Sequence, residues 1–224
     1  MPLDPLQERI ARIALALPQA RTLALAGGGA MIAHGLVDRA TRDIDLFTEV
    51  DADEALAVAV ALREALVTDG FEIREAPKPP HENRFTAVES DSGRSVEVEV
   101  FADGGRLHPR VALDVGPVLH RDDVAADKTL ALWARAEPRD FVDVVALLDE
   151  YGAEHLLRLA AAKDRGFTEA TFVDALRAIG RISPKRWQAA GVSPARVAEI
   201  EAVVEVWCRE LSDNGRDGGA GSTD

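Results

Sequence analysis

The chain has 224 residues, of which 47% are hydrophobic and 29% charged, and it contains a single cysteine. This composition indicates a folded globular protein and excludes the collagen-like, disordered and disulfide-stapled classes. One cysteine cannot form an internal disulfide, the start of the chain lacks the features of a signal peptide, and no apolar run is long enough to span a membrane. We therefore expect a protein of the reducing cytoplasm with no membrane partner.

Acidic side chains outnumber basic ones by 39 to 26, which gives a formal net charge of −13. This balance opposes binding to bulk nucleic acid, so a polyanionic substrate needs a local basic patch. Four basic residues close together offer a candidate, namely Arg177, Arg181, Lys185 and Arg186. Clusters of this size are also common on ordinary protein surfaces.

The first half of the chain mixes the helical and strand periodicities. Apolar spacing predicts helices over residues 5–17 and 51–67. Between them, a short strand over 23–26 leads into the glycine turn Gly27-Gly28-Gly29 and a helix over 30–34. Further strands are predicted at 41–47, 71–74, 85–89 and 95–101.

The second half contains helical patterns alone. These cover residues 122–135, 138–151, 153–163, 168–179 and 193–211. The change of texture predicts an α+β domain over residues 1–118 and a helical C-terminal subdomain over 119–211. Residues 212–224 have almost no apolar side chains and are predicted to be a disordered tail.

The glycine run matches neither the dinucleotide fingerprint nor the phosphate-loop pattern. Successive glycines between a strand and a helix do let backbone N–H groups approach a phosphate. A tight turn that needs positive φ angles explains the run equally well.

Two pairs of acidic residues follow the strand period of two. Asp43 and Asp45 share one face of their strand, roughly 7 Å apart at Cα, close enough to hold one or two divalent cations. Glu97 and Glu99 share a face of another strand, and either supplies a third carboxylate or a general base if the two strands are neighbours. Solvated strand faces and an acidic edge strand are the alternatives.

The helical half offers three further candidates. Lys128 lies on the apolar face of its helix, where a lysine is unexpected unless its ammonium reaches a site such as a triphosphate. Asp140 and Asp143 are neighbours on one helix, although acids near a helix start are also favoured by the helix dipole. A surface lysine is the alternative for Lys128.

The order of these motifs resembles the AbiEii/AbiGii family of nucleotidyltransferase toxins, in the DNA polymerase β-like superfamily. The resemblance covers residues 20 to 150. It assigns metal-ligand roles to Asp43 and Asp45. The third carboxylate is a departure, because residues 95–101 offer two glutamates and no aspartate; of these we prefer Glu97 to Glu99. The resemblance also implies that Lys128, Asp140 and Asp143 are needed for activity. The positions that match the family's substrate-binding motif, together with the adjacent arginine, are Gly28, Gly29, Arg39, Thr41 and Arg42.

The resemblance implies a fold and an activity. The fold is a mixed sheet with flanking helices, followed by a helical C-terminal part. The activity is Mg²⁺-dependent transfer of a nucleoside monophosphate from an NTP to the 3′ end of tRNA, with release of pyrophosphate. The resemblance also implies two metal ions in the site and a cognate antitoxin that restrains the enzyme. Gly29 departs from the pattern, because serine or threonine is frequent there, so its backbone N–H must serve instead.

Two other functions stay open at this point. A nucleotidyltransferase with a small cationic acceptor, of the antibiotic-modifying kind, fits the net charge of −13. A non-catalytic interaction protein with the same fold fits the departure at Gly29.

Overall fold

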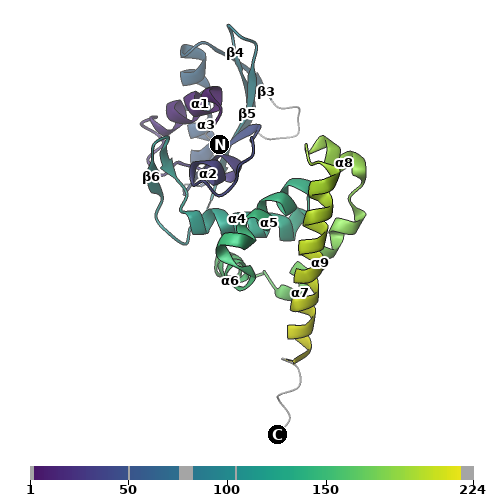
Figure 1. Ribbon diagram of the computed structural model, residues 1–224. Helices are drawn as coiled ribbons and strands as arrows, with labels where there is room; N and C mark the ends of the chain where they lie inside the picture. The colour runs from purple at the N-terminus through teal and green to yellow at the C-terminus, as the bar shows by residue number, and fades with distance from the viewer. Residues whose placement is uncertain (1–2, 50, 76–82, 104, 218–224) are drawn as a thin grey trace. The chain divides into compact units, whose positions relative to one another are not determined.

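The computed structural model describes residues 3–49, 51–75, 83–103 and 105–217 (Figure 1). These residues form two compact units that divide after Val124, inside helix α4 (Arg121–Arg135). The change from mixed to purely helical patterns in the sequence predicts the join after residue 118. The first turn of α4 belongs to the first unit, where Asp123 accepts hydrogen bonds from Leu107 N–H and His108 N–H.

The first unit is built on a mixed sheet, as the resemblance implies. The described residues form seven strands in the order β3-β4-β5-β2-β1-β7-β6, of which the pairs β2·β5 and β1·β7 are parallel. The strands are β1 (Ala24–Leu25), β2 (Asp43–Thr48), β3 (Phe71–Glu75), β4 (Arg84–Glu89), β5 (Ser95–Ala102), β6 (Val111–Leu113) and β7 (Gly116–Val118). Sequence periodicity missed β6 and β7, because three residues are too few to show a period of two.

Three helices complete the first unit: α1 (Pro5–Leu15), α2 (Gly27–Ala33) and α3 (Ala52–Thr68). Helix α1 begins at a capping box in which Asp4 accepts the N–H of Leu6, and α3 begins at Asp51, which accepts the N–H of Glu54. Both helices pack on the sheet and on each other.

The core of the first unit comes from the alternation along the central strands. Ile44 and Leu46 of β2 are fully buried, as are Val98 and Val100 of β5. Each buried aliphatic side chain of this size contributes about 1.5–3 kcal/mol. The alternation leaves the acidic residues of both strands on the opposite face.

The glycine turn predicted before α2 is wrong in one respect. Gly27, Gly28 and Gly29 form the first turn of the helix itself, and the C=O of Ala26 accepts the N–H of Ala30. Gly27 has a φ of +54°, which lets the chain pass from strand to helix without an intervening loop.

The second unit contains the rest of α4 and the helices α5 (Pro138–Tyr151), α6 (Ala153–Lys163), α7 (Glu169–Arg177), α8 (Pro184–Ala189) and α9 (Pro194–Asp217), with a 3₁₀ turn at Ala178–Arg181. Its core includes Phe141, Phe172 and Trp207, and the ring centroids of Phe172 and Trp207 are 5.1 Å apart. The six-residue helix α8 was not predicted. Helix α9 ends at Asp217, so residues 212–217 are helical and the predicted tail is wrong there; residues 218–224 lie outside the described part.

His34, at the end of α2, predicts a pH dependence of stability. Burial lowers the pKa of His34 below its ordinary value of 6.5, and its Nε2 lies 2.7 Å from the C=O of Leu119. The unfolded chain therefore takes up a proton near pH 6.5 before the folded one does, and stability is lost as the pH falls below 6.5. We expect the urea midpoint to fall between about pH 8 and pH 5.5, and to fall less in His34→Gln, whose amide keeps a donor without titrating. An equal fall in both proteins would contradict the assignment to His34.

Candidate active site

The register of the sheet brings four carboxylates together. Strands β2 and β5 are parallel neighbours, with Asp43 opposite Glu97 and Asp45 opposite Glu99. Because side chains directly opposite each other project from the same face, all four acids lie on one face of the sheet. The hypothesis that these two strands are neighbours is confirmed.

Hydrogen bonds hold the two aspartates in place. Thr41 Oγ1 donates to Asp43 Oδ1 at 2.5 Å, and the C=O of Thr41 accepts a bond from Gln7 Nε2 at 3.0 Å. The backbone C=O of Asp45 accepts the N–H of Ala26 at 2.9 Å, which joins β2 to the residue just before α2. Thr41 is buried, and its hydroxyl orients the carboxylate of Asp43.

The first turn of α2 lies against these side chains. A Cβ atom on Gly27 would stand 1.8 Å from Asp45 Oδ2, and a Cβ on Gly28 would stand 2.7 Å from Thr41 Oγ1. Only glycine therefore fits at these positions. Gly27 is a site residue that was not selected from the sequence. It could have been found because it is the first glycine after the strand over 23–26.

Gly29 and the two arginines have different surroundings. A Cβ on Gly29 would meet Leu25 Cδ1 at 3.0 Å, so this buried glycine packs α2 against β1 and offers a ligand only its backbone. The guanidinium of Arg39 lies near Gly28, at 3.6 Å from the position of a Cβ there, and Arg42 is exposed.

The two glutamates differ in their partners. Arg84 Nε donates to Glu99 Oε2 at 2.7 Å, and Glu99 is 8% exposed, whereas Glu97 is exposed. The hydrogen bond to Glu99 and the charges of Glu97 and Asp45 raise the pKa of Arg84. The guanidinium of Arg84 therefore lies at the acidic face and is bonded to Glu99. Of the two glutamates, Glu97 is the better placed to bind a metal cation.

The second unit brings the other candidates together. Lys128 Nζ lies 2.9 Å from Asp143 Oδ2, and Asp143 is almost fully buried. Asp140, equally buried, accepts two hydrogen bonds from Arg135 Nε and one from Arg135 Nη2, with the N–H of Glu137 as a further donor. Asp143 thus anchors the ammonium of Lys128, and Asp140 fixes the junction between α4 and α5. These residues belong to the second unit and the four carboxylates to the first.

The donor set on the first unit suits a hard divalent cation. Carboxylate oxygens are the side-chain ligands that Mg²⁺ prefers, and this face offers them from adjacent strands. The absence of a Cβ at Gly27 leaves the space in which Asp45 Oδ2 lies. The donor chemistry of Asp43, Asp45 and Glu97 therefore suits a divalent metal.

The family model for the nucleotidyl transferase AbiEii toxin of type IV toxin–antitoxin systems matches residues 10–190. This chain belongs to the AbiEii family. It is a nucleotidyltransferase of the toxin class, and a nucleotide substrate and an antitoxin partner are what such a family suggests. No curated protein sequence matches the chain.

Solved structures share the fold of this AbiEii protein. JHP933 from Helicobacter pylori is 13% identical and matches over 97% of this chain and 98% of its own, with a TM-score of 0.56. MenT4, a nucleotidyltransferase toxin from Mycobacterium tuberculosis, is 17% identical over 93% of this chain and 90% of its own, with a TM-score of 0.52. In the described part of the AbiEii chain, no helix combines the length and apolar character needed to cross a bilayer.

Proposed function

We propose that this AbiEii protein transfers a nucleoside monophosphate from an NTP to the 3′ end of tRNA in the cytoplasm, with Mg²⁺ as its metal. The observation that carries the proposal is the grouping of Asp43, Asp45 and Glu97 on one sheet face beside the first turn of α2. Transfer to the acceptor end blocks aminoacylation and therefore translation, and a cognate antitoxin restrains the enzyme.

The chain's own residues supply orientation and charge. Asp43, Asp45 and Glu97 hold the metal, two ions being the arrangement that suits this reaction, and Thr41 keeps Asp43 in position. Mg²⁺ held by these residues would supply positive charge to the triphosphate and would lower the pKa of the attacking hydroxyl. The backbone N–H groups of Gly28 and Gly29, at the start of α2, are the proposed hydrogen-bond donors to the phosphates of the NTP.

The basic side chains complete the binding of the nucleotide. Lys128, anchored by Asp143, neutralises the triphosphate, while Arg39 and Arg42 orient the adjoining segment. Asp140 is a positioning residue that acts through Arg135. In the reaction, the hydroxyl oxygen bonds to the α-phosphorus and the bond from that phosphorus to the bridging oxygen breaks. Pyrophosphate leaves with the electron pair, and the hydroxyl proton passes to a carboxylate or to water.

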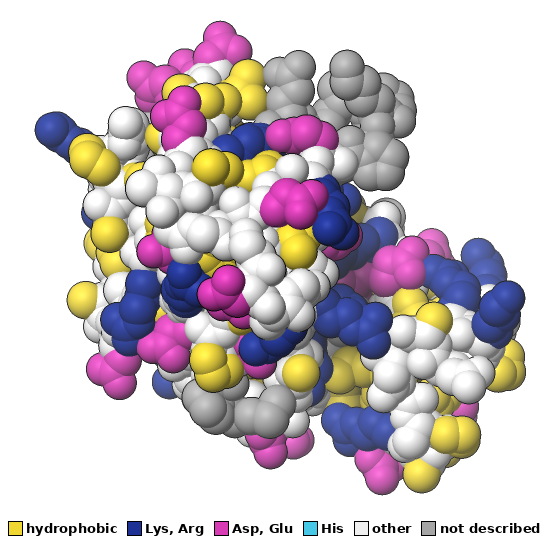
Figure 2. Space-filling model, turned by 90° about the horizontal axis from the view of Figure 1, so that it is seen from above, with side chains coloured by type: hydrophobic (Ala, Val, Ile, Leu, Met, Phe, Trp, Pro, Cys, Tyr) yellow, Lys and Arg dark blue, Asp and Glu magenta, His cyan; other side chains and the backbone are white. Residues whose placement is uncertain are grey.

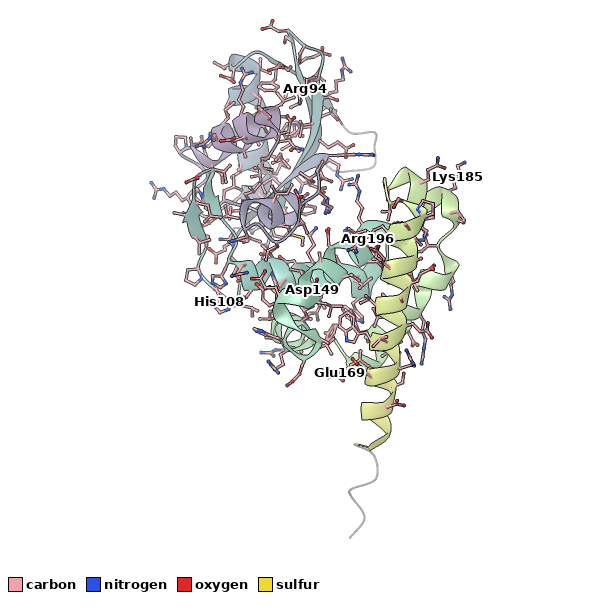
Figure 3. All side chains as sticks on the ribbon, viewed as in Figure 1. Arg94, His108, Asp149, Glu169, Lys185 and Arg196 are labelled. Atoms are coloured by element: carbon pink, nitrogen blue, oxygen red, sulfur yellow. The ribbon has the colours of Figure 1, made fainter. Side chains whose placement is uncertain are left out.

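The tRNA contact draws on local basic groups rather than on the net charge. Figure 2 shows Lys and Arg side chains interspersed with Asp and Glu on the face drawn. Arg177, Arg181, Lys185 and Arg186 are all exposed, and Lys185 lies on α8 (Figure 3). Arg177 pairs with Asp174 and Arg186 with Glu137, so the contact depends most on Arg181 and Lys185.

The experiment that tests this function is transfer of label from each NTP in turn to total tRNA, with wild type and Asp45→Asn compared on a denaturing gel. Label in tRNA with wild type alone is the expected result. Labelled small molecules in place of tRNA would support the alternative of a small cationic acceptor, which the net charge of −13 favours. Binding of Mg²⁺ and NTP without any transfer to tRNA would overturn the tRNA assignment.

The two glutamates predict unequal effects on this reaction. Glu97→Gln should lower transfer by about a hundredfold, because it removes a metal ligand, and raising the Mg²⁺ concentration should restore part of the loss. Glu99→Gln should lower it less, about tenfold, because its carboxylate is bonded to Arg84 and acts by orienting that side chain. Initial rates measured over a range of Mg²⁺ concentrations distinguish the two. A larger loss in Glu99→Gln would assign the third ligand to Glu99.

A further inference from the structure

Two imidazoles and a carboxylate gather in a part of the first unit that the transfer reaction does not use. One ligand atom from each of His108, His120 and Asp122 lies within 4.8 Å of the others. The distances to Asp122 Oδ2 are 3.6 Å from His108 Nε2 and 3.7 Å from His120 Nδ1. The two rings lie side by side, with centroids 4.4 Å apart. The side chain of His108 is labelled in Figure 3.

The backbone around this cluster is fixed by a buried group. Asp123 is fully buried, and its two carboxylate oxygens accept the N–H groups of Leu107 at 2.7 Å and His108 at 3.0 Å. This holds the segment before β6 against the first turn of α4. The C=O of His120 accepts the N–H of Val124 at 3.0 Å, which ties His120 to the same turn. The three side chains are thus presented from two chain segments that are already joined.

The two distances to Asp122 are close to those of a metal site, while the imidazole nitrogens, within 4.8 Å of each other, must approach further to share one ion. In a tetrahedral zinc site with bonds of about 2.0–2.1 Å, ligand atoms lie roughly 3.3–3.4 Å apart. The two distances to Asp122 exceed this by a few tenths of an ångström, which small side-chain rotations remove. Coordination through His120 Nδ1 replaces the 3.2 Å hydrogen bond that this atom accepts from the N–H of Asp122.

The donor chemistry differs from that of the acidic face. Imidazole nitrogen suits zinc and its neighbours among the transition metals, whereas Mg²⁺ prefers oxygen ligands throughout. Three protein ligands leave a fourth position for water. The donors of this cluster therefore suit a different class of metal from the carboxylates of the acidic face.

We propose that His108, His120 and Asp122 form a binding site for a zinc-type transition metal, which fastens the segment before β6 to the first turn of α4. The site is separate from the nucleotidyl transfer chemistry and does not depend on the proposed tRNA substrate. Metal binding favours the folded chain, because the unfolded chain does not hold the three ligands together.

The test is a thermal melt of chelator-treated full-length protein with increasing Zn²⁺ and no nucleotide. At 100 times the Kd we expect the Tm to rise by about 5–10 °C. His108→Ala, His120→Ala and Asp122→Asn should each abolish the rise. His155→Ala, in the second unit, should retain it, as should the Asp43→Asn/Asp45→Asn double variant, which removes carboxylates from the acidic face.

Two further readouts keep the test decisive. Calorimetric titration should show one Zn²⁺ per wild-type chain at this site and none in His120→Ala, and Co²⁺ should give the visible absorption of a tetrahedral site in wild type alone. A Tm of wild type that does not respond to Zn²⁺ would overturn the proposal, as would a response that survives in all three ligand variants. Loss of the response in the Asp43→Asn/Asp45→Asn variant would assign the binding to the acidic face instead. If His108→Ala does not fold, Asp122→Asn and calorimetry decide.

Discussion

Asparagine in place of Asp45 is expected to lower the rate of nucleotide transfer by about a thousandfold. The substitution keeps the size of the side chain but removes the negative charge that holds the metal, and metal stabilisation of the transition state contributes several kcal/mol. Asp43→Asn should have a similar effect, because the two residues share a strand face. The initial rate of label incorporation into RNA measures both.

The matched control for these variants is Asp91→Asn. Asp91 is an exposed residue in the turn between β4 and β5, so the variant changes the net charge equally without touching the site, and its rate should stay within about twofold of wild type. Asp45→Asn removes the repulsion of Glu99 and also the attraction of Arg84, so its Tm should stay close to that of wild type. An Asp45→Asn protein that keeps more than about a tenth of the wild-type rate contradicts the assigned role.

Alanine in place of Gly27 should lower transfer by at least about a hundredfold, although the substitution adds a single methyl group. The new Cβ would stand 1.8 Å from Asp45 Oδ2, so the carboxylate must move. A misplacement of about 1 Å in a catalytic group costs on the order of a hundredfold in rate. Initial rates of transfer, with Tm as a measure of folding, check the prediction.

Gly35→Ala separates this steric effect from backbone strain. Gly35 has a φ of +70°, close to the +54° of Gly27, but nothing lies within 4 Å of a Cβ placed there. Both alanine variants should lose about 1–2 kcal/mol of stability from the positive φ, and only Gly27→Ala should lose activity. In an Asp45→Gly background, Gly27→Ala should cause little further loss of rate, because the three Asp45 atoms that the new Cβ would meet, Oδ2, Cγ and Cβ, are all gone. Equal activity in Gly27→Ala and Gly35→Ala would show that the contact with Asp45 is unimportant.

Local periodicity predicted most of the elements. The helices over 138–151 and 153–163 begin and end where the sequence analysis places them, since a proline starts α5 and a glycine separates it from α6. The period of two identified the strands that carry Asp43 and Glu97. Short elements such as β6 and α8 escaped, because their formation depends on neighbours in space rather than on a pattern in the chain.

The partners of the site residues were not predictable in the same way. Arg84 is 15 positions from Glu99 in the sequence, and neither residue carries a signal that names the other. The pairing of Lys128 with Asp143 depends on how two helices pack, although both residues had been selected separately. His108, His120 and Asp122 were not selected, because their grouping appears only when the segment before β6 is bonded to α4.

By itself, the sequence determined the α+β class, the alternation that puts Asp43 and Asp45 on one strand face, and the motif order that resembles the AbiEii family. These depend on residues close together in the chain, where the helical and strand periods act. Only the tertiary structure decided that β2 and β5 are parallel neighbours, that Gly27 lies against Asp45 and that Arg84 occupies Glu99. Those contacts join segments that are distant in the chain. They form because the apolar faces of the strands and helices are buried together in one core, and this burial sets the register of the strands and so the positions of the side chains on the opposite face.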